Sequence, residues 1–311
     1  MKRKLALFLT AMMAVSSIPT MAFAQETAAD AADTTVEVEG GMISGEYNED
    51  GSVAVYKGIP YAAAPVGDLR WQAPQEVEPW DGVRECTEWG ASAIQPEQAP
   101  FMMWSTEFII EDTGYSEDCL TLNVWTSTDS ESEKKPVIVY IHGGGFTSGG
   151  SSCEVYDGEY IASQDVVYVS INYRVGILGF LATTALSEES EEGVSGNYAL
   201  MDQIAALQWV HDNIEQFGGD PDNVTIMGQS AGASSVNMLV SSPKAAGLFN
   251  KAVSMSYNNI DTVLPTMEEK EAQGDELFQD MTLEEMRELS TEELLAMSWS
   301  SSPCIDGVYV T

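Results

Sequence analysis

A serine flanked by glycines two residues away on each side is the part of this sequence best suited to covalent chemistry. Gly228-Gln229-Ser230-Ala231-Gly232 fits the pattern G-x-S-x-G, with a short apolar run before it and a helix-forming run after it. This strand–turn–helix context is that of a nucleophile elbow. The turn is so sharp that side chains at Gly228 and Gly232 would clash. We therefore predict Ser230 as a nucleophile, with an ordinary strand-to-helix turn as the alternative.

A cluster of three glycines is the second feature that could do chemistry. It lies in the segment HGGGF, residues 142–146, directly after an apolar run. An acyl-transfer enzyme needs backbone N–H groups that stabilise the oxyanion developing on its substrate. We expect the N–H groups of Gly144, Gly145 and Ala231 to form this oxyanion hole. A flexible loop or a phosphate cradle is the alternative, but the residues after the glycines supply no lysine for a phosphate.

Strands and helices are expected to alternate around these motifs. The alternating apolar residues in 35–59 predict a small set of antiparallel strands at the start of the domain. Residues 60–115 are irregular and rich in Pro, Gly and Trp. The alternation that follows predicts an α/β fold, with a mostly parallel sheet and helices on both faces. The expected strands are 136–141, 166–173, 223–228 and 252–255, and the expected helices are 198–217, 231–240 and two short capped helices within 266–297.

Together the two motifs resemble those of the type-B carboxylesterase family. The resemblance covers about residues 35–310 and implies the α/β-hydrolase fold. It implies hydrolysis of carboxylic esters through an acyl-enzyme on Ser230. The family also includes non-catalytic adhesion proteins, so a binding protein that kept the fold is an alternative function. Further blocks that look like the family are 58–62, 65–70, 116–123, 172–174, 196–210 and 217–225.

The base that would activate Ser230 is missing from its expected place. A serine nucleophile needs an adjacent imidazole, and in this fold the chain order is Ser, then Asp or Glu, then His. The two histidines of the chain, His142 and His211, both precede Ser230. His142 belongs to the glycine motif, where it supports the loop, and His211 reads as a surface residue. We therefore assign neither the acid nor the base.

The resemblance also implies that residues 35–311 are an incomplete, C-terminally truncated family domain. Residues 303–307 resemble the block that stands shortly before the family's acid. An inactive fragment is accordingly a further alternative to an enzyme. The carboxylates after Ser230 that do not match the acid position are Asp261, Asp275, Glu276 and Asp306.

Two of the departures from the family pattern concern positions before the nucleophile. The residue before the nucleophile is commonly Glu in relatives and is Gln229 here, which removes one charge beside the site. Relatives often carry a cysteine partner for Cys119 where Ala93 stands. A disulfide between Cys86 and Cys119 is therefore left open.

Other prominent residues have structural interpretations. Arg174 and Asp202 are expected to pair and to hold the elements around the site, rather than to act in catalysis. Trp209 is expected in the core rather than in a substrate pocket. The four Cys and two His lack metal-ligand spacing, and the glycine cluster lacks the G-x-G-x-x-G pattern, so neither a metal nor a cofactor is predicted.

The chain is strongly acidic and begins like an exported protein. It has 49 Asp and Glu against 13 Lys and Arg, and this net charge of −36 would repel nucleic acid. Residues 1–24 combine a positive start, an apolar run too short to span a bilayer and an Ala-Phe-Ala cleavage site. We expect a cleaved signal peptide, a flexible mature N-terminus over residues 25–34, and a secreted protein without a stable membrane anchor. Its expected partner is a small-molecule ester.

Overall fold

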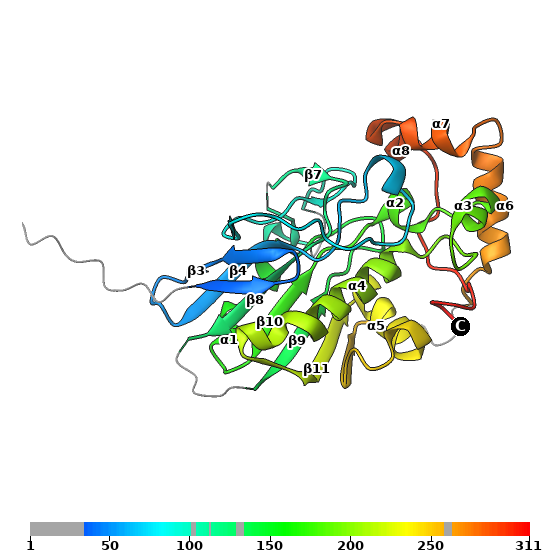
Figure 1. The fold of residues 1–311 in the computed structure, drawn as a ribbon. Coiled ribbons are helices and arrows are strands. Elements are labelled where there is room, and N and C mark those ends of the chain that lie inside the picture. The colour runs from blue at the N-terminus through cyan, green and yellow to red at the C-terminus, as the bar shows by residue number, and fades with distance from the viewer. Residues whose placement is uncertain (1–33, 101–103, 112, 129–133, 258–262) are drawn as a thin grey trace, which may run out of the picture. The chain divides into compact units, whose positions relative to one another are not determined.

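The computed structural model describes residues 34–311 apart from 101–103, 112, 129–133 and 258–262 (Figure 1). The strands of its main sheet are β3 (Glu46–Tyr47), β4 (Val53–Pro60), β8 (Thr121–Ser127), β9 (Lys135–Ile141), β10 (Val167–Ile171), β11 (Gly219–Gln229) and β12 (Lys251–Met255). Their order in the sheet is β12-β11-β9-β10-β8-β4-β3. Neighbouring strands are parallel from β10 to β12 and antiparallel from β10 to β3. The sheet is therefore mixed, with its parallel half on the side where the two motifs lie.

Helices cover both faces of this sheet, because alternate residues of a strand point to opposite faces. On β9, Val139 is fully buried in the main core together with residues of α4 (Tyr198–Asn213) and α5 (Ala231–Ser241). The next residue, Tyr140, packs on the other side in a second cluster that includes α1 (Glu159–Ala162). The predicted layers, helix against sheet against helix, are confirmed.

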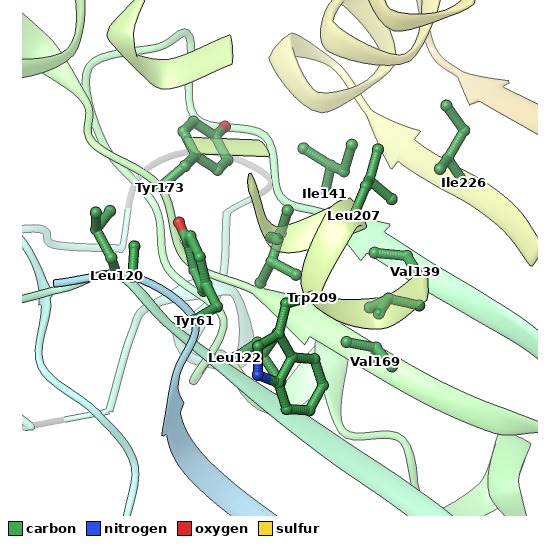
Figure 2. Packing of buried hydrophobic residues seen from close by; sticks show 14 of the residues in the cluster. Tyr61, Leu120, Leu122, Val139, Ile141, Val169, Tyr173, Leu207, Trp209 and Ile226 are labelled. Carbon is green, nitrogen blue, oxygen red and sulfur yellow. The ribbon is translucent and has the colours of Figure 1, made fainter. Parts of the chain in front are cut away.

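The main core is built from strand residues and the inner face of α4 (Figure 2). Trp209 on α4 is 1% exposed and lies among the labelled strand residues Leu122, Val139 and Val169. Its predicted place in the core is thus confirmed. Burying a large aromatic side chain in this way contributes on the order of 3 kcal/mol to stability.

Helix α4 ends four residues earlier than the sequence predicts. After Asn213 the chain tightens into a 3₁₀ turn, Ile214–Phe217, and Gly218 then adopts a φ of 76°. A glycine in the left-handed region is a common helix terminator, because it lacks the Cβ that would clash there. The apolar pattern continued through Phe217, but the backbone had already left the α-helical conformation.

The C-terminal part of the chain forms three short helices, one more than predicted. Each begins at a capping box, in which a Ser or Thr hydroxyl accepts from the N–H of a Glu three residues on, and that Glu accepts from the cap's own N–H. The helix that was not predicted is the first of the three, residues 267–277, which has few apolar residues to mark a helical face. These helices are α6 (Met267–Leu277), α7 (Leu283–Glu288) and α8 (Thr291–Ala296), and the other short helices are α2 (Gly176–Phe180) and α3 (Thr184–Glu189).

The N-terminal region adds small sheets to the main one. The predicted antiparallel opening is β1 (Thr35–Val38) paired with β2 (Gly41–Ser44), and β5 (Val83–Glu85) joins β2 in parallel. A two-stranded pair, β6 (Ser92–Ala93) with β7 (Tyr115–Ser116), lies in the irregular region. The four cysteines, Cys86, Cys119, Cys153 and Cys304, are all buried and free, so the structure has no Cys86–Cys119 disulfide.

Within the part of the chain that the structure describes, strand β12 forms one edge of the main sheet and pairs only with β11. Four of its five residues are exposed, and Val253 keeps 40% of its surface accessible. Among the described residues, no helix is long and apolar enough to cross a membrane. The predicted signal peptide, residues 1–24, lies outside the described part of the chain.

Candidate active site

Ser230 is the single residue between the end of β11 and the start of α5, where the chain turns sharply. Its backbone has φ 56° and ψ −119°, a conformation that costs a residue other than glycine of order 1–3 kcal/mol. Two backbone hydrogen bonds hold it there: its N–H donates to the carbonyl of Met255 at 3.0 Å, and its carbonyl accepts from the N–H of Ser234 at 3.0 Å. The strain is therefore fixed by β12 on one side and by α5 on the other.

The two glycines of the elbow have no room for a side chain. A Cβ on Gly232 would lie 2.0 Å from the carbonyl oxygen of Ile141, and a Cβ on Gly228 would lie 2.4 Å from the carbonyl oxygen of Gly232. Both distances are far inside van der Waals contact. The steric need for glycine at these positions is the reason that the motif could be recognised in the sequence.

The hydroxyl of Ser230 lies at the N-terminus of an 11-residue helix. Ser230 is half-buried, and within the described residues its Oγ has no hydrogen-bond partner. A helix N-terminus carries a partial positive charge, which stabilises negative charge that develops beside it. The hydroxyl is therefore exposed to a cavity and placed where an anion is favoured.

The glycine loop packs directly against this elbow. The Cβ position of Gly143 is 3.2 Å from Cβ of Ser230, and Gly144 and Gly145 have φ values of 110° and 64°. The Gly144 carbonyl accepts from the N–H groups of the two residues that follow Phe146, each at 3.1 Å. The loop is thus a tight turn whose conformation depends on glycine.

Three N–H groups around Ser230 are unpaired. Among the described residues, the N–H groups of Gly144, Gly145 and Ala231 have no acceptor. Ala231 is buried, Gly144 is half-buried and Gly145 is exposed, so these donors on one loop and one helix end are available to a ligand oxygen. The structure brings the predicted nucleophile and the predicted oxyanion donors into one place.

Ser230, Gly144 and Gly145 border one cavity of about 380 Å³, and Ala231 directly follows Ser230 at the start of α5. The volume of the cavity falls in the range of small-molecule sites. One wall of the cavity is formed by residues of the irregular region 60–115, and the sequence did not predict it. Aromatic residues in a segment without regular hydrophobic spacing do not indicate that they will lie on one surface. The lining residues are Gln98, Ala99, Trp104, Phe108, Ile109, Gly143, Gly144, Gly145, Ser148, Gly149, Cys153, Tyr156, Gln229 and Ser230.

His142 is buried beneath the glycine loop. Its ring stacks on Tyr173 with the centroids 4.2 Å apart and the planes 13° apart, and its Nδ1 lies 2.8 Å from the carbonyl oxygen of Gly143. Burial lowers the pKa of His142 to about 4, so the ring is neutral at pH 7. Since a carbonyl oxygen only accepts, Nδ1 carries the hydrogen. This histidine supports the loop and does not line the cavity.

Neither histidine of the described chain has a hydrogen bond to Ser230. His211 lies exposed on α4, with Nδ1 2.8 Å from Oδ1 of Asp212, and it is absent from the cavity lining. Asp306 accepts hydrogen bonds from Asn197 and from three backbone N–H groups, so its role is structural. Asp275 accepts from Thr184. Asp261 lies outside the described residues, and Glu276 is not in the cavity lining.

Arg174 and Asp202 form the predicted pair, and both are almost completely buried. Arg174 donates to the carboxylate from its backbone N–H at 3.0 Å, from Nε at 2.8 Å and from Nη2 at 2.6 Å. Two residues further on, the N–H of Gly176 donates to the carbonyl of Phe146 at 2.8 Å. The ion pair therefore anchors the segment that holds the end of the glycine loop.

The described residues offer no set of three or more His, Cys, Asp or Glu side chains placed to hold a metal ion. The groups that the cavity presents are a serine hydroxyl, unpaired N–H donors and apolar walls. Such an arrangement can bind a carbonyl compound with its oxygen among the donors and its carbon near the hydroxyl.

The sequence of this chain is similar to those of known esterases. Residues 32–301 match the Carboxylesterase family. Fumonisin B1 esterase of Sphingopyxis macrogoltabida is 42% identical over 254 residues, which cover 82% of this chain and 45% of that protein. Para-nitrobenzyl esterase of Bacillus subtilis is 43% identical over 205 residues, covering 66% and 40%. The chain thus spans less than half the length of these relatives.

Solved structures agree with the sequence matches. The carboxylesterase of Geobacillus stearothermophilus superposes with a TM-score of 0.74 at 39% identity, over 88% of this chain and 56% of that one. The predicted α/β-hydrolase fold class and the resemblance to type-B carboxylesterases are therefore confirmed, and this chain belongs to the carboxylesterase family.

Proposed function

We propose that this protein is a carboxylic ester hydrolase that acts through an acyl-enzyme on Ser230. The observation that carries the proposal is the position of Ser230 on the same cavity as Gly144 and Gly145, whose N–H groups are unpaired among the described residues, with the unpaired N–H of Ala231 next to it at the start of α5. Membership of the carboxylesterase family supports the same reaction. A small-molecule ester would bind with its carbonyl oxygen toward these donors.

In the proposed first step, Ser230 Oγ attacks the ester carbonyl carbon and its proton passes to a base. The carbonyl oxygen becomes an oxyanion, which the N–H groups of Gly144, Gly145 and Ala231 would stabilise by several kcal/mol. Collapse of the tetrahedral intermediate releases the alcohol, which takes up the proton. Water then attacks the acyl-serine in the same site and releases the acid. No cofactor is needed for either step.

Neither His142 nor His211 can serve as this base, because His142 is buried beneath the glycine loop and His211 lies exposed on α4 outside the cavity lining. We propose that the acid and the base come from polypeptide outside these 311 residues. The chain by itself would then accelerate hydrolysis only weakly, through its oxyanion donors and its binding cavity. We also propose export by a signal peptide cleaved after Ala24, which N-terminal sequencing of the secreted protein would test.

Hydrolysis of p-nitrophenyl acetate and p-nitrophenyl butyrate by residues 25–311 tests the mechanism, with Ser230→Ala as the matched control. Rates equal to those of the control mean that no group of this chain activates the serine. Rates clearly above the control mean that a working base is present in the chain, and our assignment of the base to other polypeptide is then wrong. Loss of covalent labelling by a fluorophosphonate in Ser230→Ala would identify the nucleophile independently.

A further inference from the structure

An aromatic pair builds one wall of the cavity beside Ser230. The ring centroids of Trp104 and Phe108 are 5.2 Å apart and the rings meet edge to face at 87°. Both residues line the cavity, yet Trp104 keeps 41% of its surface exposed. Large aromatic side chains stabilise a protein most when they are buried. The exposed ring of Trp104 therefore offers apolar contact area that the folded chain leaves uncovered.

The lining of this cavity carries no charge within the described residues. Burial raises the pKa of Cys153 to about 12 and raises the pKa of Tyr156 still further, so both stay protonated at neutral pH. The residue next to Ser230 is the neutral amide Gln229, which also lines the cavity. A charged group that entered would lose hydration and find no opposite charge in the wall.

This inference rests on the proposed esterase function and specifies its substrate. We propose that the cavity selects uncharged esters that carry an aryl group, and that Trp104 and Phe108 determine this specificity by packing against the substrate ring. A volume of about 380 Å³ lies near the lower end of small-molecule sites, which favours a single ring rather than an extended ring system. The ester carbonyl would then reach the glycine loop while the ring rests on the aromatic wall.

Binding of ketone analogues to the Ser230→Ala variant tests the proposal without any chemical step. The ligands are benzylacetone, its cyclohexyl counterpart, trimethylammoniopropyl methyl ketone, and the same ketone with tert-butyl in place of trimethylammonium. Titration calorimetry at physiological ionic strength gives the dissociation constants. We expect benzylacetone to bind about threefold to tenfold more tightly than the cyclohexyl ketone. The tert-butyl ketone should bind at least as tightly as its cationic counterpart.

Variants of Trp104 test whether the aromatic pair causes the preference for the aryl ketone. Trp104→Ala should weaken binding of benzylacetone about tenfold and remove the preference for the aryl ligand, whereas Trp104→Phe should keep that preference. Tyr160→Ala is the matched control, since Tyr160 is 77% exposed on α1 and lies outside the lining. Thermal unfolding followed by circular dichroism verifies that each variant is folded.

Three results would overturn the proposal: no measurable binding of benzylacetone, equal binding of the aryl and cyclohexyl ketones, or tighter binding of the cation than of its tert-butyl counterpart. These results are independent of the nucleophile, because Ser230→Ala cannot form an acyl-enzyme. Aryl-selective binding without hydrolysis by the wild type contradicts only the proposed function. Hydrolysis without an aryl preference contradicts only this inference.

Discussion

Tyr173 fixes the start of the glycine loop through His142. Its hydroxyl donates a hydrogen bond to the carbonyl of His142 at 2.7 Å, and its ring stacks on the imidazole of the same residue. Tyr173 is fully buried two residues after β10, so the position of the loop is tied to the middle of the sheet.

Tyr173→Phe removes this one hydroxyl and leaves the ring stack. The carbonyl of His142 would lose its partner in a buried place, so we expect the free energy of unfolding to fall by about 1–3 kcal/mol. Urea unfolding followed by circular dichroism measures the change. The exposed Tyr160→Phe, which removes a hydroxyl from the surface, should leave the midpoint unchanged; equal losses in the two variants would show that the buried bond has no special role.

Asp202→Asn leaves the Arg174 guanidinium buried without an opposite charge. Uncompensated buried charges are costly, and we expect a loss of about 3–5 kcal/mol in the free energy of unfolding. The comparison is Glu46→Gln, which breaks the more exposed pair of Lys57 and Glu46 and should cost less than about 1 kcal/mol. Similar midpoints for both variants in urea would contradict the anchoring role of the buried pair.

The stability of the protein should depend on pH through His142. Burial lowers the pKa of His142 from 6.5 to about 4, so below pH 6.5 the unfolded chain binds a proton that the folded chain does not. Stability that is present above pH 6.5 is therefore lost as the pH falls toward 4, by about 2 kcal/mol between pH 7 and pH 5.

The measurement for His142 is the difference in unfolding free energy between pH 7 and pH 5, for the wild type and for His142→Gln. Carboxylates titrate in both proteins, so their effect cancels in the comparison. His211→Gln replaces an exposed histidine and serves as the control. If His142→Gln loses as much stability on acidification as the wild type, burial of this imidazole is not the cause.

Gly232→Ala should disrupt the elbow. The new Cβ would meet the carbonyl oxygen of Ile141 at 2.0 Å, so the elbow or β9 must move, and we expect a loss of at least about 3 kcal/mol or failure to fold. Gly247→Ala is the control, because Gly247 also has a positive φ of 87° but open space around its Cβ position. It should cost only about 1 kcal/mol. Soluble yield and thermal midpoint distinguish the two.

The sequence predicted those parts of the site that depend on local spacing. The elbow and the glycine loop were recognised because steric crowding requires glycine at fixed distances from Ser230 and His142. The aromatic wall was not predicted, since Trp104 and Phe108 reach the cavity through tertiary packing of a segment without periodicity. The same limit applies to the end of α4, where the apolar pattern runs on to Phe217 although the α-helix stops at Asn213.

The exposed edge of β12 has a consequence for the behaviour of the protein in solution. An unpaired strand edge can add a strand from another molecule, which is a route to aggregation. Mutual repulsion between chains of net charge −36 opposes that contact. Salt shortens the reach of this repulsion to about 8 Å at physiological ionic strength and about 3 Å at 1 M. The acidity of the chain therefore opposes pairing of this edge with another molecule, and high salt would weaken that opposition.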